Sequence, residues 1–227
     1  MRYQNKKFLI NAVTIFPEAF NSLLNISIIG SARKKGIWEL ITTNIKKFSE
    51  NNDIDDKPYG GGPGMILKAD ALQNAFTNAV SNLENHTNNY NKIMLSPRGE
   101  RLNQNIVKEL SNSEGIIIVC GRYEGVDQRF IEYNKLREIS LGDFVLSGGE
   151  PAAMAMIDAI IRLLPNVLGN PESLLEESFN DDLIEYQQYT KPRIWKNLKV
   201  PNVLLSGNHK KIKEWRLKKS IAKKKDR

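Results

Sequence analysis

The sequence predicts an α/β fold, with a mostly parallel sheet covered by helices on both faces. Short apolar segments rich in β-branched residues alternate with amphipathic segments of helical length over the first 165 residues. Such alternation is typical of parallel strands joined by crossover helices. The length of 227 residues and the 41% hydrophobic content allow one large or two modest domains with a substantial core.

The amino-terminal elements are expected in the order strand, helix, helix, strand. A buried strand is expected over residues 8–15, and Pro17 suits the first position of a helix. The core-facing residues of that helix should be Phe20, Leu23 and Leu24. A second helix, through Ile28 and Ala32, should stop at Gly36, before a strand over residues 37–43.

Strands and helices continue to alternate in the middle of the chain, and the helical segments are long enough to connect parallel strands. The expected elements are helices over residues 69–83, 103–110 and 127–133, and strands over residues 92–95 and 116–120.

The stretch from 138 to 164 organises the candidate site. It begins as a strand, turns at Gly142, resumes as strand-like residues 144–146 and breaks at 147–151, before an apolar helix that carries Arg162. Its glycines are Gly142, Gly148 and Gly149. They allow the backbone to approach a flat ligand closely, which predicts a ligand cradle. The alternative is an ordinary strand-turn-helix connection.

A domain boundary is expected after Pro165, which ends this helix. We predict one domain over residues 1–165, a linker over 166–176 and a small, mostly helical domain over 177–227. The last helix should start near Asn208 and run past Trp215.

The basic charge of the chain is concentrated at its carboxyl end. The net charge is +7, but residues 191–227 hold 14 Lys and Arg against Glu214 and Asp226, and the rest of the chain is acidic overall. A cationic segment that carries tryptophans suits a polyanion, and nucleic acid is the expected partner. The alternative is a tail that only improves solubility. Trp215 is expected in a small core, at helical spacing from Ile212.

Several function classes are disfavoured. No apolar run reaches membrane-spanning length and no leader is evident, so a cytoplasmic protein without membrane attachment is expected. Cys120 is the single cysteine, so internal disulfides and cysteine clusters for metal are excluded, and a buried position is expected for it. No other set of metal ligands is visible.

The glycine-rich segment 59–65, YGGGPGM, does not form a nucleotide-binding P-loop. Lys68 follows Leu67 and precedes Ala69, so the lysine and hydroxyl of that motif are missing. The segment is expected to be a flexible lid or a close-packed backbone wall.

Three loops follow expected strands, and they begin at Leu95, at Cys120 and at Ser140. The carboxyl ends of neighbouring parallel strands share one edge, where an open α/β sheet usually binds its ligand. The alternative for each loop, taken alone, is a turn whose glycines are structural and bind no ligand.

The motifs of the whole chain, taken together, resemble one family. In order, they are FPEAF, YGGGPGM, LSPRGERL, CGRYEGVDQR, ISLGDFVLSGGE, IDAIIRLLPNVLG, EESF, YTKP and VPNVLLSGNHKKIKEWR. The chain resembles the bacterial tRNA (guanine-N1)-methyltransferases, the TrmD family. The resemblance implies a SPOUT fold with a deep trefoil knot, a homodimer that shares its active sites, and methyl transfer from S-adenosyl-methionine to the guanosine immediately 3′ of the anticodon in tRNA.

The same resemblance implies a set of cofactor contacts in the three loops. They are Leu95, Ser96 and Pro97; Gly121, Tyr123 and Glu124; and Ser140, Leu141, Gly142, Asp143, Phe144, Val145, Leu146, Gly148 and Gly149.

Two residues are implied in catalysis. Guanine N1 must lose a proton, and the charge that develops on O6 must be neutralised. The family base is the aspartate of a DSF motif, which here reads Glu177-Ser178-Phe179, so Glu177 is the expected base, with Glu176 and Asp181 as rivals. Arg162 is the expected cation. Without the resemblance, Arg162 would be read as a partner of Asp158, and Glu177 as part of an acidic linker.

Magnesium is associated with the family's activity, and the resemblance implies that Glu177, Glu124 and the cofactor carboxylate could hold it.

The candidate RNA contacts lie in the basic region. They are Lys191, Arg193, His209, Lys210, Lys211 and Arg216. Residues 182–191 depart from the family pattern, which affects these contacts rather than the reaction. The competing hypotheses are another SPOUT methyltransferase, acting on ribosomal RNA or a ribose hydroxyl, and a non-catalytic RNA-binding protein with this fold.

Overall fold

The computed structural model describes residues 7–169 and 185–225 of the chain. The chain divides into two compact units, residues 1–169 and residues 170–227.

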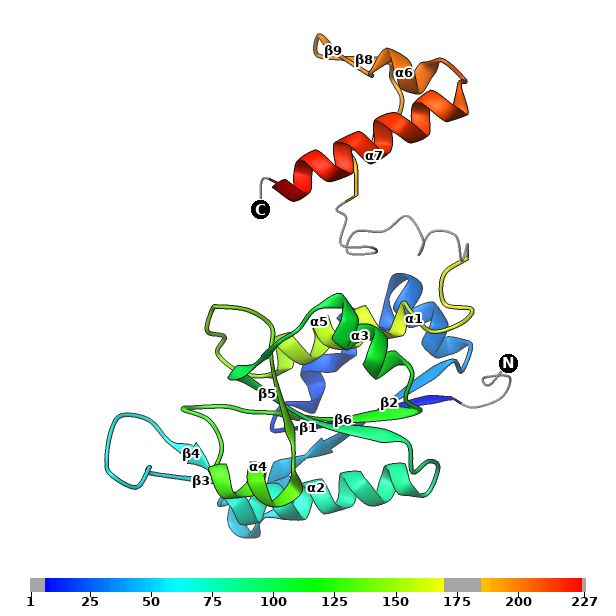
Figure 1. The fold of residues 1–227 in the computed structure, drawn as a ribbon. Helices are drawn as coiled ribbons and strands as arrows, with labels where there is room; N and C mark the ends of the chain where they lie inside the picture. Colours follow the sequence, from blue (N-terminus) through cyan, green and yellow to red (C-terminus); the bar gives the residue numbers. More distant parts are fainter. Residues whose placement is uncertain (1–6, 170–184, 226–227) are drawn as a thin grey trace. The chain divides into compact units, whose positions relative to one another are not determined.

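The first unit is built on a five-stranded sheet (Figure 1). Its strands are β1 (Phe8–Thr14), β2 (Trp38–Asn44), β5 (Tyr90–Arg101), β6 (Gly115–Cys120) and β7 (Arg137–Ser140), in the spatial order β2-β1-β6-β5-β7. All four neighbouring pairs are parallel. The predicted parallel sheet is therefore confirmed.

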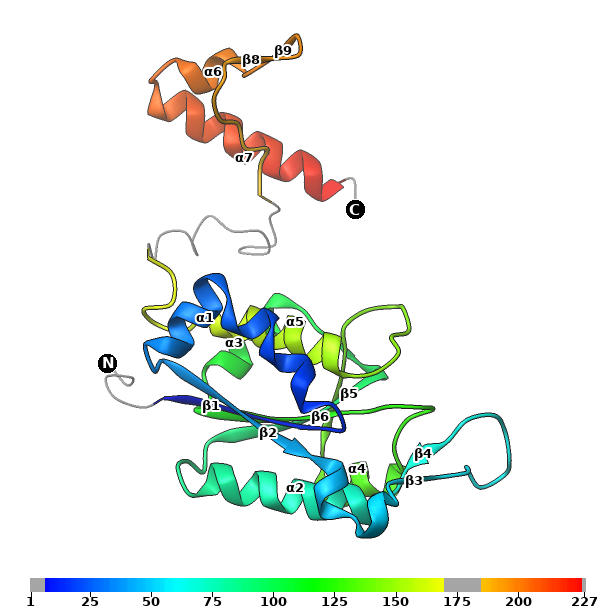
Figure 2. The same ribbon diagram turned by 180° about the vertical axis from the view of Figure 1, so that it is seen from behind.

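Helices cover both faces of this sheet (Figures 1 and 2). One face carries α1 (Ser27–Lys34), α3 (Gln104–Ser111) and α5 (Glu150–Ile161), and the other carries α2 (Ala69–Glu84) and α4 (Gln128–Asn134). Successive strand residues point to opposite faces, so Ile116 and Ile118 of β6 enter one core while Ile117 and Val119 enter the other. A strand buried on both faces is apolar throughout, which explains the run in β6.

The segment after β1 differs from the prediction of one helix. It forms two short 3-10 helices, η1 (Pro17–Asn21) and η2 (Leu23–Asn25). Phe20 and Leu24 are fully buried, whereas Leu23 is 50% exposed. Adjacent residues on a helix point in directions that differ by 100° or more, so Leu23 and Leu24 cannot both face the core.

The glycine-rich segment connects two short strands. The preceding elements are η3 (Ile45–Phe48) and η4 (Glu50–Asn52), followed by the antiparallel pair β3 (Asp55–Asp56) and β4 (Ile66–Leu67). Tyr59, at the start of the glycine-rich segment, is fully exposed. The segment is thus the loop of a small hairpin.

The described residues of the second unit form a hairpin and two helices. The elements are β8 (Ile194–Trp195), β9 (Leu198–Lys199), α6 (Asn202–Leu205) and α7 (His209–Lys225). The ring of Trp215 packs against Tyr186 and Tyr189, with centroids 6.4 and 6.3 Å away. The predicted helix and the packed position of Trp215 are both confirmed. Within the described residues, no helix is long and apolar enough to cross a bilayer.

Candidate active site

The three loops expected to form a site leave β5, β6 and β7, which are neighbours in the sheet. The first loop is residues 95–99, the second is 121–125 and the third is 140–149. We refer to them as loops 1, 2 and 3. Because the strands are parallel, all three loops start at the same edge of the sheet.

Loop 1 is a large bulge inside β5. Leu95 and Glu100 of β5 both pair with Ile139 of β7. Residues 96–99, which lie between them, are therefore extruded from the sheet. Gly99 lies against β7 so closely that an added Cβ would overlap backbone atoms there. This bulge explains why β5 extends well beyond the predicted strand 92–95.

Loop 2 contains two residues with positive φ, a conformation that is uncommon for residues other than glycine. Tyr123 has φ of 59° and Gly125 has φ of 129°. The Glu124 N–H donates to the Met65 carbonyl over 3.0 Å, and the Leu67 N–H donates to the Gly125 carbonyl over 3.0 Å. The glycine-rich hairpin therefore lies directly against loop 2.

Loop 3 is not strand-like at residues 144–146, where the sequence predicted that the strand resumes. The Gly142 N–H donates to the Ser140 hydroxyl oxygen over 3.3 Å, which turns the chain away from the sheet. Phe144, Val145 and Leu146 are 53%, 84% and 38% exposed. Apolar residues can form a strand only where a neighbouring strand pairs with them, and none does so here among the described residues.

Loops 2 and 3 are joined through their backbones. The Gly149 N–H donates to the Gly121 carbonyl over 2.9 Å, and Gly148 forms a β-bridge with Arg122. Loop 3 is also held to the end of β5 by the Leu102 N–H, which donates to the Ser140 carbonyl over 2.8 Å, and by an ion pair of 3.2 Å between Arg101 and Asp143. Loops 2 and 3 therefore meet directly, and the part of β5 just after loop 1 is bonded to loop 3.

A buried polar network fixes this junction. Glu150, in the first turn of α5, is 1% exposed and accepts hydrogen bonds from the Thr14 hydroxyl (2.6 Å) and from Arg122 Nε (3.0 Å). Arg122 Nη1 also donates to the Ser147 carbonyl over 3.1 Å, and the guanidinium lies 4.6 Å from the ring centroid of Phe16. The Glu150 carboxylate thus connects α5 to β1 and loop 2, and Arg122 extends the network to loop 3.

Sequence reasoning missed Thr14, Arg122 and Glu150, which the structure identifies as the residues that hold the loops. A usable signal was present at Glu150, a charged residue directly after two glycines at the start of an apolar helix. Such a residue suits the positive end of a helix dipole, and it needs a partner when buried.

We expect Gly149→Ala to destabilise the first unit by about 1–3 kcal/mol, the usual cost of overpacking. An added Cβ would lie 2.7 Å from the Cys120 Cα and 3.0 Å from the Gly121 nitrogen, and both are backbone atoms that cannot move aside. Urea unfolding followed by circular dichroism measures the loss. The matched control is Gly169→Ala, where no atom of the described residues lies within 4 Å of an added Cβ, so a change within about 0.5 kcal/mol is expected. Equal stability of the two variants would refute the close packing.

The residues predicted to contact the cofactor all lie in this loop cluster. Leu95, Ser140 and Gly149 are buried, whereas Pro97, Tyr123 and Glu124 are exposed. Exposed apolar groups on loops 2 and 3, Tyr123 and Phe144 among them, suit the face of a flat heterocycle, and the glycines bring backbone close to it. The chemical character of the cluster therefore fits an adenosyl group.

Arg162 does not lie beside these loops. It is the carboxyl-terminal cap of α5, whose first residues touch loop 2, and its N–H donates to the Asp158 carbonyl over 3.2 Å. A helix of 12 residues is about 18 Å long, so Arg162 sits at the opposite end of α5 from the loops. Glu177 and its rivals Glu176 and Asp181 lie outside the described residues, as does most of the predicted linker.

No group of three or more His, Cys, Asp or Glu within the described parts of the chain is arranged to hold a metal ion. Glu124 is the one member of the expected magnesium set that the structure describes, and it is exposed. Cys120 is buried as expected, and burial raises the pKa of its thiol well above the ordinary value.

The predicted RNA contacts lie in the second unit. Five of them, Lys191, Arg193, His209, Lys210 and Lys211, are exposed. The sixth, Arg216, is half-buried, and its guanidinium lies 4.8 Å from the ring centroid of Tyr186. The Lys211 N–H donates to the Asn208 side-chain oxygen over 3.0 Å, so Asn208 caps the first turn of α7.

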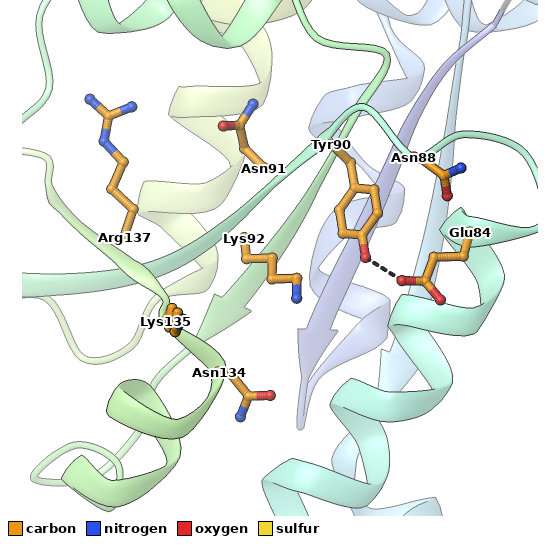
Figure 3. Close-up of a pocket in the computed structure, with 8 residues that line it drawn as sticks. All are labelled: Glu84, Asn88, Tyr90, Asn91, Lys92, Asn134, Lys135 and Arg137. Carbon is orange, nitrogen blue, oxygen red and sulfur yellow. Dashed lines mark hydrogen bonds between the residues drawn. The ribbon is translucent and has the colours of Figure 1, made fainter.

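A cavity of about 500 Å³ lies at the other edge of the sheet, where β5 and β7 begin (Figure 3). It is lined by Glu84, Asn88, Tyr90, Asn91, Lys92, Asn134, Lys135 and Arg137. The Tyr90 hydroxyl donates to Glu84 over 2.8 Å, and desolvation together with this bond raises the pKa of Tyr90 to about 12. None of the predicted site residues lines this cavity.

Comparisons with known proteins give one consistent family. The family model described as tRNA (Guanine-1)-methyltransferase TrmD matches residues 8–227. The chain is similar to the tRNA (guanine-N(1)-)-methyltransferase of Neorickettsia sennetsu, 49% identical over 205 residues, which covers 90% of this chain and 89% of the relative. The corresponding protein of Wolbachia pipientis subsp. Culex pipiens is 47% identical over 224 residues, covering 97% and 95%. That of Chelativorans sp. is 46% identical over 211 residues, covering 92% and 88%.

Proposed function

This chain belongs to the tRNA (guanine-1)-methyltransferase TrmD family, and from that premise we propose where on tRNA it acts and which residues carry the reaction. The chain is a methyltransferase that modifies N1 of guanine in tRNA, in agreement with relatives that match nearly its whole length. The target we propose is the guanosine immediately 3′ of the anticodon, and the proposed methyl donor is S-adenosyl-methionine. A cytoplasmic location follows from that substrate.

The donor is proposed to bind among loops 1, 2 and 3. The single observation that carries this assignment is the backbone junction of Gly149 with Gly121, which brings two of the loops to one point. When bound, the donor supplies an electrophilic methyl group on a sulfonium. The proposed fold of residues 1–165 is the knotted SPOUT form of the family, in which these loops surround one ligand.

Two side chains are proposed to prepare the guanine. Guanine N1 carries a proton, and its lone pair becomes nucleophilic when a base removes that proton. Glu177 is the proposed base, because it stands where the family carries the aspartate of its DSF motif. Arg162 is the proposed cation beside O6, where negative charge develops as the N1 proton leaves.

The active site is proposed to be shared between two subunits. The length of α5 supports this, because Arg162 lies at the far end of the helix from the loops of its own chain. A second copy related by a twofold axis can bring its own residues to those loops. Magnesium remains a proposed activator, with Glu124 and Glu177 as its protein ligands, and no step of the mechanism depends on it.

The second unit is proposed to bind the tRNA. Its exposed cations Lys191, Arg193, Lys210 and Lys211, together with His209, suit phosphates of the anticodon stem. Such contacts fix the position of the RNA without reading its sequence, so the choice of guanosine depends on the active site.

We expect labelled methyl transfer to tRNA that carries G immediately 3′ of the anticodon, and none to the same tRNA with A at that position. Adenine carries no proton at N1 and has no O6. The proposed base, Glu177, would therefore have no proton to remove, and the proposed cation, Arg162, no oxygen to contact. The assay uses radiolabelled S-adenosyl-methionine with the two matched transcripts. Transfer to ribosomal RNA or to a ribose hydroxyl would support another SPOUT activity, and RNA binding without transfer would support a non-catalytic protein.

A further inference from the structure

The hairpin of the second unit presents a large aromatic ring to solvent. β8 and β9 pair antiparallel, with Ile194 opposite Lys199 and Trp195 opposite Leu198 (Figure 1). Trp195 is 58% exposed and Leu198 is 68% exposed. Exposing such rings and side chains to water is unfavourable, and exposed apolar clusters commonly mark binding surfaces.

The turn of this hairpin defines the backbone that carries the ring. Lys196 and Asn197 both have positive φ, 47° and 67°, which is the backbone of a two-residue type I′ turn. The Val200 N–H donates to the Arg193 carbonyl over 3.0 Å and extends the pairing. Because this turn matches the natural twist of the strands, Trp195 is displayed on a short, regular scaffold.

The surroundings of Trp195 are cationic. The ten residues from 191 to 200 include Lys191, Arg193, Lys196 and Lys199 and no acidic residue. The Lys196 ammonium lies 5.0 Å from the centroid of the Trp195 ring. An exposed aromatic ring among cations fits a nucleic acid, because the ring can stack on a base while the cations contact the phosphates.

The same charges argue against the hairpin of a second copy as the occupant. Two copies of the hairpin in contact would bring two sets of four cations together, and like charges facing each other weaken association. RNA complements both the apolar and the charged part of this surface.

We propose that Trp195 is a stacking platform for an unpaired base of the bound tRNA. This inference rests on the proposed function, since it takes tRNA as the ligand, and it assigns one specific contact to the second unit. Unpaired bases in loops are the parts of RNA that proteins stack on aromatic side chains.

Intrinsic fluorescence tests the contact directly, because the three tryptophans lie in different environments. Trp38 is 1% exposed, Trp215 packs against two tyrosines, and Trp195 is exposed. We expect tRNA to quench the emission of the wild-type protein, after correction for absorption by the RNA. In Trp195→Phe most of this quenching should disappear while binding is retained, because phenylalanine can also stack.

Kinetics provide the second readout. We expect Trp195→Ala to raise KM for tRNA about tenfold or more, with kcat and the Kd for S-adenosyl-methionine unchanged. Trp195→Phe should restore most of the loss. The matched control is Ile194→Ala, on the same strand but the other face and 56% exposed, where KM should stay within about twofold.

These outcomes separate this inference from the proposed function. Methylation by the wild-type protein with an unchanged KM in Trp195→Ala would overturn the stacking role and leave the function intact. Equal losses in Trp195→Ala and Ile194→Ala, or a Trp195→Ala protein with altered sedimentation, would assign the hairpin to folding or subunit contact and would also overturn it.

Discussion

Arg162→Ala and Glu177→Gln are each expected to lower the rate of single-turnover methyl transfer by about 100-fold or more, the usual effect of removing an oxyanion partner or a general base. Each change should leave guanine N1 a poor nucleophile, the first because the charge on O6 would lack its proposed partner and the second because the N1 proton would stay in place. The measurement is rapid-quench transfer from labelled S-adenosyl-methionine at saturating tRNA. The Kd for the methyl donor should not change, because neither residue belongs to loops 1, 2 or 3.

Neighbouring acidic residues provide the controls for the base. Glu176→Gln and Asp181→Asn remove one carboxylate each from the same segment, and both variants should retain near-normal transfer. Glu177→Asp should retain more activity than Glu177→Gln, because it keeps the carboxylate. A Glu177→Gln protein that transfers methyl groups at the normal rate, or a Glu176→Gln protein that does not, would assign the role to another residue.

Mixing the two inactive proteins tests whether the site is shared between subunits. If Arg162 of one subunit works with Glu177 of the other, a mixed dimer contains one site with both residues intact and one with neither. Random exchange of equal amounts should then restore about a quarter of wild-type activity, since half of the dimers are mixed and each has one working site. If both residues of a site come from one chain, no mixture gains activity.

The sequence allowed the main sheet and the loop cluster to be predicted, because these depend on local patterns. The apolar run of β6 and the stops after Leu95, Cys120 and Ser140 can be read from the chain itself. The convergence of the loops follows from parallel pairing alone. The sequence therefore predicted that the loops of Gly121 and Gly149 start at the same edge of the sheet. It did not predict the hydrogen bond between these two residues.

The features that escaped prediction depend on contacts between distant segments. Residues 144–146 have the composition of a strand, but they do not join one because no neighbour pairs with them in the described structure. The bulge in β5 forms because Ile139 of β7 pairs with both Leu95 and Glu100, the residues on either side of the extruded segment. The hydrogen bond of Glu150 with Thr14 could not be predicted either, because the two residues are 136 positions apart in the sequence.

Glu150→Ala is expected to lower the free energy of unfolding of the first unit by about 3–5 kcal/mol, the usual cost of breaking a buried ion pair from one side. The change leaves the Arg122 guanidinium, whose side chain is 23% exposed, without its carboxylate, and it removes the acceptor of the buried Thr14 hydroxyl. Urea denaturation followed by circular dichroism measures the loss. Glu150→Gln should cost less, because its amide oxygen can still accept from Thr14.

The control is the ion pair of Lys7 with Glu39, which has a similar N–O distance of 2.7 Å but side chains 44% and 47% exposed. Glu39→Ala should cost only about 0–1 kcal/mol, because water screens that pair. Since Glu150 joins Arg122 of loop 2 to α5, Glu150→Ala should also weaken binding of S-adenosyl-methionine under conditions where the protein remains folded, whereas Glu39→Ala should not. Similar losses of stability in the two variants would show that the buried network contributes no more than a surface pair, and normal donor binding by folded Glu150→Ala would show that loops 2 and 3 keep their positions without it.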